Sequence, residues 1–336
     1  MIQAHVLDSW TSLDARGTLG YAVAVIVSGF AAPLFLFCAG FSVALSAGSK
    51  LRRHDDAVAA SRSVMKRGAW IFLLAFLFRV QAWFLGWSHN PASLLKVDIL
   101  NVMGPSIIAA GALWGIFRGR AARCVACAAA TALVAFMTPP IRATHALDFL
   151  PNSIENYLRP PRGSAWFSIF PWTGFVFAGA LPGVLLHDVT ARAEESRLNM
   201  WLAISGIALA STAYAMSFLP SVAGPSEFWG GSPSFFFLRA GILVTTIPFA
   251  YMWERAVVTS SWSPLQQLGR TSLFIYWIHV EMVYGLISLP IHKSLTHPQA
   301  WAAFAAFATF MLFCSVMKDR LVAGFTARKA PPYATV

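Results

Sequence analysis

Nine stretches of mostly apolar residues constrain the fold of this chain more than any other feature. They lie at about 19–47, 69–88, 97–117, 121–138, 166–186, 200–220, 236–252, 269–290 and 299–317. An α-helix needs about 20 apolar residues to cross a bilayer, and backbone polar groups in lipid must be bonded within the segment. We therefore predict an all-α, polytopic transmembrane helix bundle. It has about nine complete spans plus a truncated first helix at residues 1–10.

The charged residues are few, and their distribution predicts an orientation. Only 12% of the residues are charged, against about 25% in soluble domains, which argues against a soluble enzyme. Sixteen of the 25 Lys and Arg side chains fall in alternate loops and the C-terminal tail, and six fall in the opposite loops. By the positive-inside rule we expect a protein of the cell inner membrane with a cytoplasmic C-terminus.

The same distribution explains the net charge of +11. Basic residues beside spans face anionic lipid headgroups, so we expect the lipid bilayer as partner and no nucleic acid. No long linker divides the chain. We expect one transmembrane domain over residues 1–330 and a disordered tail over 331–336. The four cysteines lie in apolar stretches and are interpreted as packing residues, so no metal site is predicted.

Polar residues inside spans are costly and mark candidate functional sites. Arg79 lies near the midplane of its span, and Asp98 and Asn101 share one helix face near the outer end of theirs. The span limits put Arg79 and Asp98 about 13 Å apart along the membrane normal. This is too far for a direct ion pair unless the two helices are staggered.

Two histidines are candidate proton acceptors. His279 continues a polar stripe with Ser272 and Tyr276 on an otherwise apolar helix, and a neutral imidazole there can act as a general base. His5 lies three residues before Asp8, a spacing that can fix the tautomer of a base. The other six histidines fall in loops, where we expect them to be solvated.

Four stretches of the sequence form a set, beginning with GFAAPLFLFCAGFSVALSAG (29–48) and KVDILNVMGPS (96–106). The first is similar to the second span, and the second to the "V-D-x-L-x-x-x-G" helix, of the heparan-α-glucosaminide N-acetyltransferase-like family of membrane acyltransferases. FPWTGFVFAGALPG (170–183) and LGRTSLFIYWIHVEMVYG (268–285) resemble two later helices of the family in the same order. Each motif alone is weak, but four in order are more specific. The "D-x-x-R-G" start of the family's first helix is absent here.

The resemblance implies acyl transfer across the membrane. The donor is acetyl-CoA or another acyl-CoA, bound as a substrate and not as a permanent cofactor, and the acceptor is an amine or hydroxyl of a sugar or glycan on the outer face. His279 or His5 takes the acceptor's proton, Asn101 or Arg79 stabilises the oxyanion, and Asp98 orients the base or holds the acceptor. The donor's phosphates are met from the inner face by cationic side chains. The predicted donor-binding residues are Lys66, Arg67, Arg270 and Arg79.

Two other functions fit the same residues. In a transporter or flippase, the buried Arg79, Asp98, His279 and Glu281 form a substrate or proton path. In a non-catalytic membrane scaffold, the buried polar groups only specify how the helices pack. An acyltransferase needs the candidate residues to line one tunnel, whereas a scaffold needs each polar group paired and dry.

Overall fold

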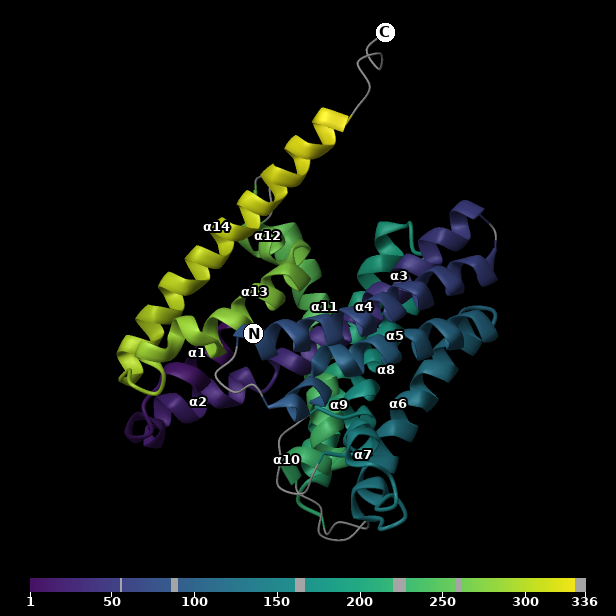
Figure 1. Cartoon of the computed structure of the whole chain (residues 1–336). Helices are drawn as coiled ribbons and strands as arrows, with labels where there is room; N and C mark the ends of the chain where they lie inside the picture. The colour runs from purple at the N-terminus through teal and green to yellow at the C-terminus, as the bar shows by residue number, and fades with distance from the viewer. Residues whose placement is uncertain (55, 86–89, 161–166, 220–227, 258–261, 330–336) are drawn as a thin grey trace. The chain divides into compact units, whose positions relative to one another are not determined.

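The computed structural model describes the whole chain except residues 55, 86–89, 161–166, 220–227, 258–261 and 330–336, and this part is built of helices joined by turns and loops (Figure 1). Eight helical segments within this part are long and apolar enough to cross a membrane. The only strand-like contact among these residues is an isolated bridge between Thr11 and Leu295. The predicted all-α polytopic fold is confirmed.

The chain falls into two compact units, and each is described separately. The first unit comprises residues 1–31, 81–89 and 258–336. Its elements are α1 (Ile2–Trp10), η1 (Asp14–Gly17), α2 (Leu19–Ser28), the last turn of α4 (Ala57–Leu85), α12 (Pro264–Arg270), α13 (Ser272–Tyr284), η3 (Leu286–Ile291) and α14 (His297–Lys329).

The second unit comprises residues 32–80 and 90–257. Its elements are α3 (Ala31–His54), most of α4, η2 (Pro91–Leu95), α5 (Ile99–Ile116), α6 (Arg120–Ala143), α7 (Asn152–Leu158), α8 (Ile169–Leu186), α9 (Arg192–Met216), α10 (Phe228–Gly231) and α11 (Pro233–Val257). Within it, α6 packs on α8 and α9 packs on α11.

Most predicted spans match observed helices, with two informative differences. The predicted span 19–47 contains two helices, since α2 ends at Ser28 with Gly29 as its C-cap and α3 begins at Ala31, although Leu19–Arg53 as a whole is still one candidate membrane span. The predicted span 269–290 consists of α12, α13 and η3, none of which reaches 18 residues. The predicted tail 331–336 lies outside the described residues, and the single domain over 1–330 remains a prediction.

Glycines let the helices of the second unit approach at backbone distance. A Cβ added to Gly40 of α3 would lie 1.8 Å from the Val176 carbonyl oxygen of α8, and one added to Gly179 would lie 1.9 Å from the Phe37 oxygen. Gly206 of α9 and Gly241 of α11 meet in the same way. The hydrophobic effect does not drive helices together in lipid. Small residues stabilise the association instead, because they allow close van der Waals contact between the helix backbones.

In the first unit, helix α1 lies against α13 and α14 (Figure 1). Val6 and Trp10 pack with Val283 in a buried apolar cluster. The carbonyl oxygen of Val283 accepts hydrogen bonds from Ser9 Oγ at 2.9 Å and Trp10 Nε1 at 3.3 Å. These contacts fix the register of α1 against the end of α13, and so bring residues far apart in the sequence into one cluster.

Candidate active site

Four polar side chains of α1 and α13, called here the histidine cluster, meet where α13 ends. They are His5, Asp8, His279 and Tyr284. The Tyr284 hydroxyl donates to Asp8 Oδ2 at 2.8 Å, and His5 Nδ1 lies 3.1 Å from the same hydroxyl oxygen. Asp8 is also held by Arg16, which donates to its backbone oxygen and lies 4.0 Å from its carboxylate.

This arrangement determines where the proton of His5 lies. A tyrosine hydroxyl has one proton, and here that proton points to the Asp8 carboxylate, which only accepts. The Tyr284 oxygen must therefore accept from His5, so Nδ1 of His5 carries the proton. In a neutral imidazole the other nitrogen, Nε2, then holds a free lone pair. The cluster thus presents His5 Nε2 as a base.

His279 forms the buried end of the cluster. Its side chain has no exposed surface, and its Nδ1 lies 2.6 Å from the Ile275 carbonyl oxygen one turn earlier. Because a carbonyl only accepts, Nδ1 carries the proton and Nε2 is unprotonated. Nε2 has no hydrogen-bond partner in the described part of the chain. The imidazole rings of His5 and His279 have centroids 5.3 Å apart.

Exposure changes along the cluster. Asp8 is exposed, Tyr284 is 37% exposed and His5 is half-buried, while His279 is fully buried. The cluster therefore leads from a surface carboxylate to an unpaired buried nitrogen. A buried polar atom left unpaired costs free energy and calls for an explanation.

A second group of polar side chains, called here the capping cluster, lies in the other unit. Its members are Arg79, Asp98, Asn101 and Tyr157. Asp98 is the N-cap of α5, and its Oδ1 accepts from the backbone N–H groups of Leu100 at 2.8 Å and Asn101 at 3.3 Å. The Asn101 side chain accepts from the Asp98 N–H at 3.1 Å and donates to the Tyr157 oxygen at 3.2 Å.

The expected separation of Arg79 and Asp98 is wrong. Arg79 Nη2 lies 2.8 Å from Asp98 Oδ2, with side chains only 16% and 6% exposed. Arg79 lies six residues before the end of α4, about 9 Å of helix rise. An extended arginine side chain spans much of that distance. The separation expected from the span limits was that of the two backbone positions, and it did not include the length of the arginine side chain.

Three of the four predicted donor-binding side chains lie at the surface, and the fourth, Arg79, is mostly buried and paired with Asp98. Lys66 and Arg67 are exposed in the first half of α4, and Arg270 is exposed at the end of α12. The structure brings His5 and His279 together, and separately brings Arg79, Asp98 and Asn101 together. Lys66 and Arg67 belong to the unit of the capping cluster, and Arg270 belongs to the unit of the histidine cluster.

Sequence reasoning missed Tyr284 and misplaced His187. Tyr284 lies at the end of a run of apolar residues, and its pairing with His5 bridges 279 positions. The only signal in the sequence is its place directly before Gly285, at a helix end. His187 was expected to be solvated but is buried, 6% exposed, at the end of α8. A Cβ on Gly48 would collide with its ring, so the absence of a side chain there makes room for it.

The comparison with protein families finds a match, which covers the first part of the chain. The family described as heparan-α-glucosaminide N-acetyltransferase, catalytic, matches residues 1–219. No curated protein matches the chain. The match includes His5 and the capping cluster and ends before His279 and Tyr284. Because it covers well over half of the chain, this multi-pass membrane protein belongs to the heparan-α-glucosaminide N-acetyltransferase family and is acetyltransferase-like in function.

Proposed function

We propose that the protein transfers an acetyl or other acyl group from acyl-CoA to an amine or hydroxyl of a sugar or glycan at the outer membrane face, with His5 as general base. The observation that carries the proposal is the hydrogen-bonded chain from Asp8 through Tyr284 to His5. A base whose other nitrogen is held by an oriented partner is the arrangement that activates nucleophiles in acyl transfer.

The reaction balances with these groups. The acceptor's nitrogen or oxygen attacks the thioester carbonyl carbon, and its proton passes to His5 Nε2. The carbon–sulfur bond then breaks, and the imidazolium returns the proton to the departing CoA thiolate. Asp8 stabilises the imidazolium through Tyr284, as a carboxylate does for a catalytic histidine.

His279 supplies a second contact for the acceptor. Its Nε2 is unprotonated and has no partner among the described residues, and its ring lies beside that of His5. An amine that approaches the two rings has two protons and can donate one hydrogen bond to each Nε2, whereas a hydroxyl has one proton and can donate to one of them. This contact would orient the attacking atom, which is the main contribution of a positioning group.

The donor would bind through exposed cations predicted to lie on the cytoplasmic side, because cationic side chains form short, charge-assisted hydrogen bonds with phosphate oxygens. Arg270 is exposed in the unit of the histidine cluster, and Lys66 and Arg67 offer the same chemistry in the other unit. This assignment rests on the predicted orientation, with a cytoplasmic C-terminus in the cell inner membrane. We leave Asp98 and Asn101 outside the reacting groups, because their polar atoms are already bonded within the capping cluster.

The test is acetyl transfer by the purified, detergent-solubilised full chain, with radiolabelled acetyl-CoA as donor and glucosamine as the probe acceptor. We expect His5→Ala to bind acetyl-CoA normally by calorimetry but to lose about 100- to 10,000-fold in turnover, the range for a general base. His145→Ala, in an exposed loop of the other unit, is the matched control and keeps its activity. Normal turnover by His5→Ala, or no acetyl-CoA binding by the wild type, contradicts the proposal.

A further inference from the structure

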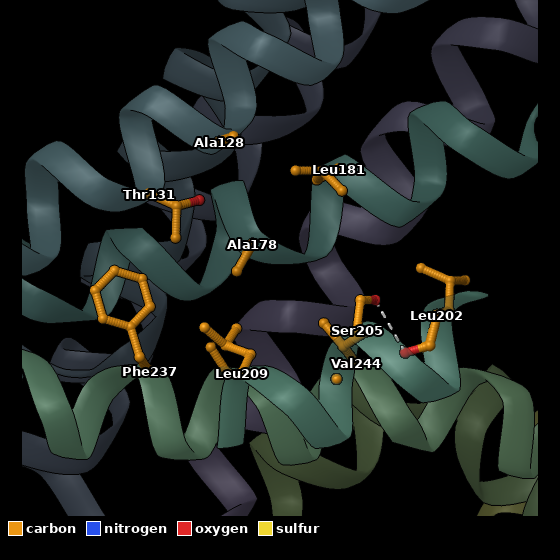
Figure 2. A pocket seen from close by; sticks show the side chains of 11 residues that line it. Ala128, Thr131, Ala178, Leu181, Leu202, Ser205, Leu209, Phe237 and Val244 are labelled. Atoms are coloured by element: carbon orange, nitrogen blue, oxygen red, sulfur yellow. Dashed lines mark hydrogen bonds between the residues drawn. The ribbon is translucent and has the colours of Figure 1, made fainter. Parts of the chain in front are cut away.

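An apolar cavity among four helices of the second unit is not used by the proposed reaction. It has a volume of about 220 Å³ and is lined by residues of α6, α8, α9 and α11 (Figure 2). Each of these helices contains a candidate membrane span. The lining residues are Ala128, Thr131, Ala178, Leu181, Leu202, Ser205, Gly206, Leu209, Phe237, Ala240 and Val244.

The chemistry of the lining excludes polar ligands. Only Thr131 and Ser205 contribute hydroxyl groups, and both donate to carbonyl oxygens of their own helices. Thr131 bonds Cys127 O at 2.8 Å, and Ser205 bonds Leu202 O at 3.2 Å, the contact that Figure 2 marks. A bound water needs two to four polar partners, and a sugar or phosphate needs more. The cavity therefore suits a hydrocarbon.

The position of the cavity along its helices indicates which hydrocarbon can reach it. Its lining residues on α9 fall at 202–209, the middle of a helix that runs from Arg192 to Met216. The middle of a membrane-spanning helix lies in the hydrocarbon core, where lipid headgroups do not reach. Three apolar side chains of α9, Trp201, Ile204 and Ile207, are 56%, 49% and 60% exposed, as expected of a helix face in contact with lipid.

The cavity opens at the surface of the unit and is large enough to hold a small apolar molecule. Ala128, Ser205 and Leu209 are exposed, so the cavity opens at the surface of the unit instead of being sealed. An apolar cavity of about 150 Å³ is sufficient to hold benzene, and this one is larger. The close contact of Gly206 with Gly241 holds α9 on α11, which keeps one wall of the cavity fixed.

We propose that this cavity is a binding site for one acyl chain of a bilayer phospholipid, which enters sideways from the membrane core. It contains no group that recognises a headgroup, so the site selects a chain segment. The proposal does not depend on the acyltransferase function, because none of the lining residues belongs to the histidine cluster or the capping cluster.

The test uses a phosphatidylethanolamine with a photoactivatable group near the end of one acyl chain, reconstituted with the full chain in nanodiscs. After irradiation, peptide mass spectrometry locates the labelled residues. We expect label on the buried lining residues Ala178 and Ala240, which a lipid outside the unit does not touch. Label confined to outward positions such as Ile204 and Ile207 overturns the proposal.

Matched variants on α6 sharpen this test. Ala128→Phe places a ring into the cavity and should abolish label at Ala178 and Ala240. Ala129→Phe makes the same change at an exposed neighbour outside the lining and should leave the label unchanged. A parallel experiment uses the same photoactivatable chain as a soluble acyl-CoA. Label from the acyl-CoA but not from the phospholipid also overturns the proposal, because the occupant would then be a donor chain.

Discussion

The capping cluster and the histidine cluster both place polar side chains where apolar ones are expected, but they differ in how those side chains are bonded. In the capping cluster, both carboxylate oxygens of Asp98 and both polar atoms of the Asn101 side chain have protein partners. In the histidine cluster, the chain of hydrogen bonds ends at His5, and the buried Nε2 of His279 has no described partner.

The difference separates a structural role from a chemical one. In the capping cluster the carboxylate of Asp98 and the amide of Asn101 are bonded within the protein and tie helix α5 to α4 and α7, although the buried Nε of Arg79 has no partner among the described residues. A cluster with a free lone pair in a buried place is unfavourable for folding alone. A bound ligand that donates a hydrogen bond to the lone pair would remove this cost. The following predictions test whether the two clusters differ in this way, from the largest expected effect on the clusters to the smallest.

Removing Asp98 should strongly destabilise the fold. Asp98→Ala leaves the Arg79 charge without its carboxylate in a site where the arginine side chain is 16% exposed. Breaking a buried ion pair on one side costs about 3–5 kcal/mol, and the N-cap of α5 is lost as well. The measurement is the unfolding free energy in detergent. A double variant, Arg79→Leu with Asp98→Asn, should recover much of the loss; equal instability of both variants contradicts a charge effect.

Tyr284→Phe should impair catalysis without affecting stability much. The change removes the hydroxyl that links His5 to Asp8, and a hydrogen bond to a charged group contributes about 1.5–3 kcal/mol. We expect kcat to fall by about ten- to hundredfold with KM unchanged, because only the charged transition state loses support. Asp8→Asn should behave similarly. A purely structural role for Tyr284 predicts lower stability and unchanged kcat in the remaining folded protein.

His279→Leu should leave stability unchanged or raise it by about 1 kcal/mol, because it removes a buried nitrogen that has no described partner. Acetyl transfer should fall through a higher KM for the acceptor. Thermal unfolding and acceptor titration at saturating acetyl-CoA measure the two effects. A loss of stability comparable to that of Asp98→Ala would place His279 in a satisfied structural network instead.

The smallest expected effect on stability comes from an ion pair in the exposed loop before α7, which lies outside both clusters and serves as their reference. Hydrogen bonds from His145 and Arg159 lower the pKa of Asp148. A carboxyl with a depressed pKa stabilises the fold above its unfolded pKa of about 4, and this stabilisation is lost as pH falls through the folded value. His145→Ala should therefore lower the melting temperature slightly at pH 7 and leave it unchanged in strong acid. If the variant and the wild type still differ in melting temperature in strong acid, the effect does not come from the ionised Asp148 carboxylate.

Hydropathy was sufficient to predict most of the long helices, because spans in lipid must bond their own backbones. The break after Ser28 was harder to place, although Gly29 and Pro33 mark it. The ion pair of Arg79 with Asp98 could not be placed by counting residues, since side-chain reach and helix stagger do not appear in the sequence. The sequence pointed to His5 with Asp8, but the intervening Tyr284 comes from a helix more than 270 residues away.

The central claim is that Tyr284 holds His5 in the tautomer with its proton on Nδ1. The most direct measurement is the ¹⁵N NMR spectrum of histidine-labelled full-length protein in detergent near neutral pH, with His5→Gln used to assign the signals. We predict that the wild type has His5 neutral with the proton on Nδ1, and that Tyr284→Phe gives a mixture of tautomers. A proton on Nε2 of His5 in the wild type, or identical spectra for the two proteins, would contradict the claim.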